Sequence, residues 1–89
     1  MSKKTVWKFR VRANSTIEMP EGAEILFVKA KKPSIYVWAL VDPKAKLEIV
    51  DLKIVETGEE FEDCGRLNYL GTVSQNSGYR VHHVFRKLS

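Results

Sequence analysis

The residues best suited to chemistry in this sequence are two adjacent histidines, His82 and His83. Neighbouring residues of a β-strand point to opposite faces, so these two imidazoles cannot act on one substrate as a pair. His83 alternates with Val81 and Phe85, which favours a hydrogen-bonded histidine on a buried face over a catalytic base. His82 lies among arginines, and we expect its side chain to be solvated.

No other group of side chains forms a recognisable catalytic or metal-binding motif. The acidic residues of 59–63 lack the spaced oxygen ligands and the turn glycine of a calcium loop, which indicates a solvated loop. No serine or cysteine lies in a nucleophile elbow, and no glycine-rich phosphate loop occurs. We therefore expect a protein that is not an enzyme and that uses neither a metal nor a cofactor.

Charge is the most informative property of the sequence. The 89 residues carry a formal net charge of +4 at pH 7, but the charges are unevenly distributed. Residues 48–63 hold seven carboxylates against Lys53, a net charge of −6, which leaves +10 in the rest of the chain. We expect a bipolar molecule whose basic surface attracts an anionic partner.

Two segments of alternating residues position the basic side chains. In the expected strands 5–12 and 79–87, apolar and aromatic residues alternate with basic ones, which then lie on the outer faces. If these terminal strands are neighbours, their basic residues form one surface, and arginine binds phosphate through two parallel hydrogen bonds. The predicted ligand-binding residues are Lys8, Arg10, Arg12, Arg80, His82 and Arg86. The same alternation is also typical of outer faces that are merely solvated, and the sequence leaves both interpretations open.

Short apolar stretches separated by turn residues predict an all-β fold. Strands are expected at 5–12, 24–31, 34–42, 47–57, 69–73 and 79–87, with a brief extended segment at 17–19. Residues 24–42 are expected to form an antiparallel hairpin, and Gly71 predicts a bulge or the close approach of another backbone. Six to seven short strands in a single domain, residues 1–89, indicate a small antiparallel sandwich or barrel, and the sequence does not distinguish the two.

The stretch 34–42 is expected to be the central strand. Its run of β-branched, aromatic and small apolar residues predicts a strand covered on both faces. Trp38 shares a face with Tyr36 and Leu40, which predicts a core residue. On that prediction, Trp38→Ala costs about 3–5 kcal/mol of stability.

Composition indicates a small cytoplasmic protein. The sequence is 44% hydrophobic and 29% charged, and no apolar run approaches the ~18 residues of a membrane span. The first residues lack the apolar region of a signal peptide, so no export is expected. Cys64 is the one cysteine, which excludes an intrachain disulfide and favours a reducing compartment. The small core, the opposite charges and the two-sided apolar pattern of 47–57 predict self-association, most simply as a two-fold dimer.

A set of short sequence motifs occurs in order along nearly the whole chain. They are Val6–Lys8, Thr16–Ala23, Trp38–Pro43, Thr57–Gly58, Tyr69–Val73 and His83–Phe85. Together they resemble a family of small, functionally uncharacterised proteins encoded by bacteriophages and prophages. The resemblance implies a phage accessory protein in the cytoplasm of a bacterial host, and it implies no mechanism. The turn at 29–34 and the acidic loop at 59–63 depart from the pattern expected of that family.

Three functions are consistent with these features. The first is a non-catalytic phage binding protein, in an anti-defence role, that sequesters an anionic host signal of nucleotide type. The alternative is an interaction module that masks a host or phage protein, since complementary charge favours docking. Single-stranded nucleic-acid binding ranks third, because it requires aromatic residues exposed among basic ones. Trp7 and Phe9 lie on the face opposite Lys8 and Arg10, which separates stacking residues from cations.

Overall fold

Seven β-strands and their connections make up the part of the chain that the structure describes. The structure is a computed structural model that describes residues 3–12, 16–31, 33–62, 65–75 and 80–88, and these residues contain no helix. The strands are β1 (Thr5–Val11), β2 (Thr16–Pro20), β3 (Glu24–Lys31), β4 (Ser34–Val41), β5 (Leu47–Glu56), β6 (Leu67–Gln75) and β7 (Arg80–Lys87). The all-β prediction is confirmed, and every predicted strand has a counterpart. Cys64 and Tyr79 lie outside the described residues.

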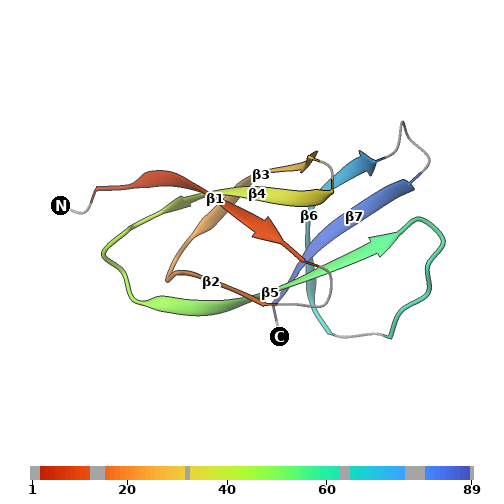
Figure 1. Cartoon of the computed structure of the whole chain (residues 1–89). Helices are drawn as coiled ribbons and strands as arrows, with labels where there is room; N and C mark the ends of the chain where they lie inside the picture. Colours follow the sequence, from red (N-terminus) through yellow and green to blue (C-terminus); the bar gives the residue numbers. More distant parts are fainter. Residues whose placement is uncertain (1–2, 13–15, 32, 63–64, 76–79, 89) are drawn as a thin grey trace.

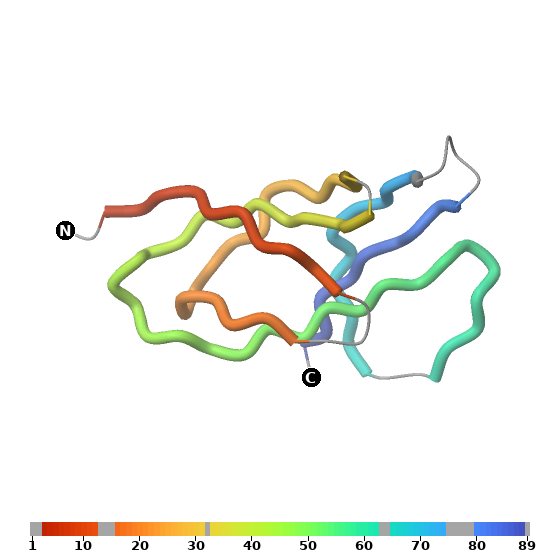
Figure 2. The backbone as a smooth tube through the Cα atoms, viewed as in Figure 1, coloured from red at the N-terminus to blue at the C-terminus, as the bar shows by residue number. Residues whose placement is uncertain are grey.

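The strands form two antiparallel sheets that face each other (Figure 1). One sheet has the order β1-β4-β3 and the other has the order β2-β5-β7-β6, which makes the fold a sandwich. β4 is the middle strand of its sheet, as predicted, and it pairs with β3 as the predicted hairpin. The chain passes from one sheet to the other after β1, β2 and β4, as the backbone trace shows (Figure 2). As a result β1 and β7 lie in different sheets, so the condition under which their basic residues would form one surface is not met.

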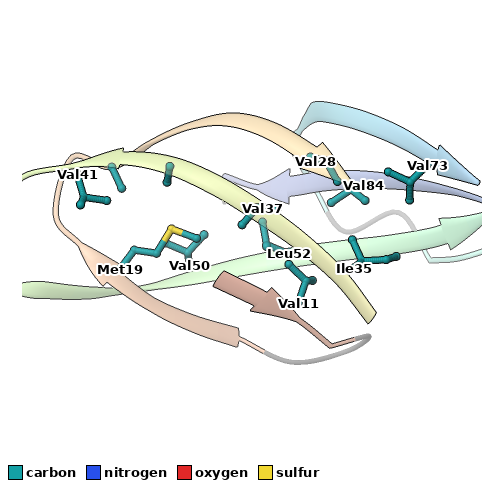
Figure 3. Packing of buried hydrophobic residues seen from close by; sticks show 12 residues of the cluster. Val11, Met19, Val28, Ile35, Val37, Val41, Val50, Leu52, Val73 and Val84 are labelled. Atoms are coloured by element: carbon teal, nitrogen blue, oxygen red, sulfur yellow. The ribbon is translucent and has the colours of Figure 1, made fainter. Parts of the chain in front are cut away.

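Small aliphatic side chains fill the space between the two sheets (Figure 3). The three-stranded sheet contributes Val11, Val28, Ile35, Val37, Ala39 and Val41, and the four-stranded sheet contributes Met19, Val50, Leu52, Val73 and Val84. Val37 and Val84 have no exposed surface at all. Burying one such side chain completely contributes about 1.5–3 kcal/mol, so this layer is the main source of stability.

Trp38 is not part of this core. After the buried Ser34 at its start, the buried residues of β4 are the odd-numbered ones, so Tyr36, Trp38 and Leu40 lie together on the outer face and are half-buried. The prediction that these three side chains share one face is confirmed, but the prediction that this face points into the core is wrong. Both faces of β4 are apolar, so alternation cannot tell inside from outside, and the sheets of a sandwich lie only about 10 Å apart. Valine and alanine fit that spacing, and the rings are left on the surface.

Among the described residues, each sheet shows one bulge-like shift in register, and each shift lies in the pairing of an end strand. The β3–β4 pairing shifts between Ile25 and Phe27, and the β6–β7 pairing shifts between Tyr69 and Gly71. In β3 the shift places Phe27 opposite Trp38 on the outer face, while Val28 stays in the core. Of the two alternatives predicted for Gly71, a bulge or the close approach of another backbone, the register shift beside Gly71 supports the first. A β-carbon at Gly71 would lie 3.4 Å from the side chain of Val28, so the two sheets approach closely there.

Two leucines of β5 test the assignment of the core. Leu52 is 1% exposed between the sheets, whereas Leu47 is 57% exposed. We expect Leu52→Ala to lower the free energy of unfolding by about 2–5 kcal/mol, because it removes buried methyl groups and leaves a cavity. Leu47→Ala, the matched control in the same strand, should change it by no more than ~0.5 kcal/mol. Urea titrations followed by tryptophan fluorescence measure both values, and equal effects would contradict the assignment.

Candidate functional site

A pocket of about 440 Å³ lies where β1 ends and β4 begins. Both sheets contribute to its lining, which consists of Arg10, Val11, Arg12, Pro33, Ser34, Ile35, Ile54 and His82. Three of the six predicted ligand-binding residues, Arg10, Arg12 and His82, therefore line one pocket. They come from opposite ends of the sequence and meet across the sandwich, not on one sheet.

The end of β1 holds the two arginines at the mouth of this pocket. Val11 is 4% exposed and anchors the end of the strand in the core. The residues on either side of it, Arg10 and Arg12, are exposed, as alternation predicts. Ser34, at the start of β4, is buried and adds a hydroxyl group to the lining. The pocket thus has cationic groups at the surface and a polar group deeper in.

His82 enters the pocket from the four-stranded sheet. Its side chain is only 14% exposed, so the expectation of a solvated histidine is wrong. Its Nε2 atom lies 3.5 Å from Oε1 of Glu56. Its Nδ1 atom is buried and has no hydrogen-bond partner among the described residues. A buried polar atom without a partner costs about 1–3 kcal/mol, so a bound group that reached Nδ1 would gain affinity by satisfying it.

The two remaining predicted arginines pair with carboxylates of β5. The Nη2 atom of Arg86 donates a hydrogen bond to Oε1 of Glu48 at 3.1 Å, beside a smaller pocket of about 200 Å³. Arg86 lies opposite the buried Leu52, so it occupies the inner face of β7 and not the predicted outer face. The Nε atom of Arg80 lies 3.6 Å from Oε1 of Glu56. The acidic strand β5 thus lies beside the basic strand β7, which neutralises part of the predicted bipolar charge.

Lys8, the sixth predicted residue, lies away from the pocket, on the outer face of the three-stranded sheet. Its Nζ atom is 5.1 Å from the centre of the Tyr36 ring. That distance is within the range of a cation–π interaction. Lys8 therefore belongs to a different surface from Arg12 and His82.

His83 is held by hydroxyl groups on the outer face of the four-stranded sheet. Its Nε2 atom hydrogen-bonds Oγ1 of Thr57 at 2.6 Å, and its Nδ1 atom hydrogen-bonds Oγ1 of Thr72 at 3.1 Å. Tyr69 shares a further hydrogen bond with Thr72. The prediction of a hydrogen-bonded histidine is confirmed, although its position in the core is not. In the described ranges no group of three or more His, Cys, Asp or Glu side chains could hold a metal ion.

One family model covers nearly the whole chain. The model for "Domain of unknown function (DUF7352)" matches residues 2–89. The chain belongs to the DUF7352 family. No curated protein and no solved structure gives a significant match. Within the described residues of this DUF7352 chain, no helix has the length and apolar character needed to cross a membrane.

Several residues of the DUF7352 site carry no signal in the sequence. Pro33, Ser34 and Ile54 line the pocket, yet their side chains are uncharged and no pattern in the sequence connects them. The pocket is assembled from four places in the chain, 10–12, 33–35, Ile54 and His82, which come together only when the sheets pack. Alternation along β1 was enough to find Arg10 and Arg12, because one face of that strand is clearly apolar.

The Arg86–Glu48 pair of this DUF7352 chain should contribute to stability. The two side chains are 25% and 35% exposed, so their pair lies between a surface and a buried ion pair. A double-mutant cycle with Arg86→Met and Glu48→Gln should give a coupling free energy on the order of 1–2 kcal/mol. The matched control is the exposed pair Lys46–Glu21 at 3.9 Å, which should couple by less than ~0.5 kcal/mol. Equal coupling in the two cycles would show that burial does not strengthen the Arg86 pair.

Proposed function

We propose that this DUF7352 protein is a non-catalytic binding protein that captures a phosphate-bearing small molecule of nucleotide type. The proposed site is the pocket between the end of β1, the start of β4 and the four-stranded sheet. One observation carries the proposal: Arg10 and Arg12 of one sheet and His82 of the other line the same pocket. Such convergence of polar groups in a concave site is typical of small-molecule binding.

The lining offers a separate environment for each part of a nucleotide. Arg10 and Arg12 can bind phosphate oxygens through parallel, charge-assisted hydrogen bonds. Ile35 and Ile54 supply apolar surface for a base or a sugar, and the volume of about 440 Å³ falls within the ~300–1,000 Å³ of known ligand sites. The unsatisfied Nδ1 atom of His82 offers a hydrogen bond to the ligand, which would favour polar groups at that depth.

A phage origin and a role against host defence complete the proposal. The ordered motifs of the sequence, which resemble phage and prophage proteins, support this origin. A pocket rich in arginine and without a catalytic motif suits sequestration of a host nucleotide signal in the bacterial cytoplasm, since sequestration needs only affinity. The alternative, masking of a host or phage protein, rests on charge complementarity and makes no use of the pocket.

Arg12 and Arg80 provide a matched test of the pocket. Both are arginines among the predicted ligand-binding residues, but only Arg12 lines the pocket. We expect Arg12→Glu to weaken binding of a nucleotide by about 10- to 100-fold, which corresponds to the loss of one or two charge-assisted hydrogen bonds. Arg80→Glu should weaken binding less than Arg12→Glu does, and some loss is expected because Oε1 of Glu56 lies 3.6 Å from Arg80 and 3.5 Å from the pocket residue His82. Isothermal titration calorimetry against a panel of linear and cyclic nucleotides measures these affinities at two salt concentrations.

The controls separate capture from general charge attraction. Circular dichroism and thermal unfolding must show that both variants fold like the parent protein. Equal losses in the two variants would mean that net charge, and not the pocket, attracts the ligand. If no nucleotide of the panel binds the parent protein, the capture proposal fails and the masking of a protein becomes the leading hypothesis.

A further inference from the structure

The outer face of the three-stranded sheet gathers aromatic and basic side chains, and all of them except Arg10 lie outside the pocket. The register across β1, β4 and β3 places Lys8, Trp38 and Phe27 in one row. The next row holds Arg10, Tyr36 and Lys29, and Lys31 follows beside Ser34. Directly paired residues share one face of a sheet. We call this surface the aromatic face, defined by Lys8, Arg10, Phe27, Lys29, Lys31, Tyr36 and Trp38.

Three rings form a continuous group on the aromatic face. The centre of the Phe27 ring lies 5.6 Å from that of Trp38, which lies 6.3 Å from that of Tyr36. Phe27 is 54% exposed, although a large apolar side chain gains most from burial. Trp38 and Tyr36 are half-buried, so part of each ring surface is open to solvent. The rings thus offer stacking surfaces, and contacts between them hold their orientation.

Four cations surround these rings. Lys8, Arg10, Lys29 and Lys31 are all exposed, and Lys8 lies over the Tyr36 ring at 5.1 Å. Neither of the two rows that contain the rings includes a carboxylate. The acidic residue of this face, Glu24, lies in the row beyond Trp38, opposite Leu40. The aromatic face therefore combines a positive potential with stacking surfaces.

From this arrangement we propose that the aromatic face binds single-stranded nucleic acid. Bases stack on Phe27 and Trp38, and the phosphates lie beside Arg10, Lys29 and Lys31. Base stacking on aromatic side chains tolerates any sequence, and a groove or face of cations follows the backbone. Single-strand binding requires aromatic residues exposed among basic ones. Trp7 and Phe9 do not meet this requirement, but the rings of the aromatic face do. The aromatic face shares Arg10 with the pocket, but its rings and its lysines lie outside the pocket, so the proposal does not depend on ligand capture there.

The charge of the aromatic face decides against a second copy of the chain as its occupant. A two-fold dimer through this face would place the same patch on both partners, so four cations would oppose four cations. Duplex nucleic acid is also a poor fit, because its bases are already stacked on each other and cannot reach the rings. An extended polyanion with free bases satisfies both the charges and the rings.

Phe27 and Phe61 provide a matched pair of substitutions. Both are exposed phenylalanines, at 54% and 41%, and the Nζ atom of Lys53 lies 5.4 Å from the Phe61 ring. Phe61 follows β5 and lies outside the aromatic face. We expect Phe27→Ala to weaken binding of labelled oligo(dT) and oligo(U) by at least ~5-fold, the loss of one stacked base. Phe61→Ala should bind as the parent does. Fluorescence anisotropy with strands of about 12 nucleotides measures this, since related sites span ~4–16 nucleotides.

Salt dependence tests the cations independently of the rings. Three phosphate contacts, at Arg10, Lys29 and Lys31, predict a slope of log affinity against log salt of about −2 for a single strand. Lys29→Gln combined with Lys31→Gln should reduce the magnitude of that slope by about 1.4. Since Phe27, Lys29 and Lys31 do not line the pocket, nucleotide capture should be unchanged in these variants. Comparison of oligo(dT) with oligo(U) then shows whether DNA or RNA is preferred.

The fluorescence of Trp38 tests whether a base contacts this ring directly. The chain has two tryptophans, so Trp7→Phe leaves Trp38 as the single tryptophan, and stacking of a base should quench its emission. Absence of binding to any single strand at low salt would overturn the proposal, as would equal effects of Phe27→Ala and Phe61→Ala. Duplex DNA that bound as tightly as single strands would also overturn it. A dimer in light scattering that Phe27→Ala converts to a monomer would assign the face to self-association instead.

Discussion

The structure depends on burying the small residues of β4 against the four-stranded sheet. Val37 has no exposed surface, and neither has Val84 on the opposite side of the core. Side chains of this size let two sheets approach closely, and they leave no room for rings between them. The position of every aromatic residue of β4 follows from this constraint. Tyr36 and Trp38 lie outside because the interior is already filled.

Much of the fold could be predicted from the sequence because strand ends carry clear signals. β3 was predicted with its observed bounds, and β4 with a difference of one residue. The sequence predicts which face of a strand points into the core only where the other face is plainly polar, as in β1. In β7 the sequence predicts that the face with His83 and Phe85 is buried. In the structure Val84 lies in the core, and Arg86 lies on the same face of the strand as Val84. Hydrogen bonds with Thr57 and Thr72 keep His83 satisfied on the outer face, and no local pattern predicts partners so distant in sequence.

The candidate site was only half predictable, because charge counted along the chain does not show which charges become neighbours. Arg80 and Arg86 carry the same charge as Arg10 and Arg12, but they lie beside the carboxylates of β5. The pairing of β5 with β7 is a long-range event that depends on the order of strands in the sheet. Likewise, Phe27 reaches the outer face only because of the bulge in β3. Counting residues along β3 would have placed it on the same face as Ile25.

The two bulges also bear on solubility. β3 and β6 are end strands that contact each other across the sandwich, and each has one edge whose backbone groups pair with no strand of its own sheet. A regular edge of this kind can add a strand from another molecule and start aggregation. A bulge interrupts the spacing of donors and acceptors and increases the local twist, so a foreign strand cannot extend the ladder past it. The irregular pairing at Ile25/Phe27 and at Tyr69/Gly71 thus protects one side of the molecule from unwanted polymerisation.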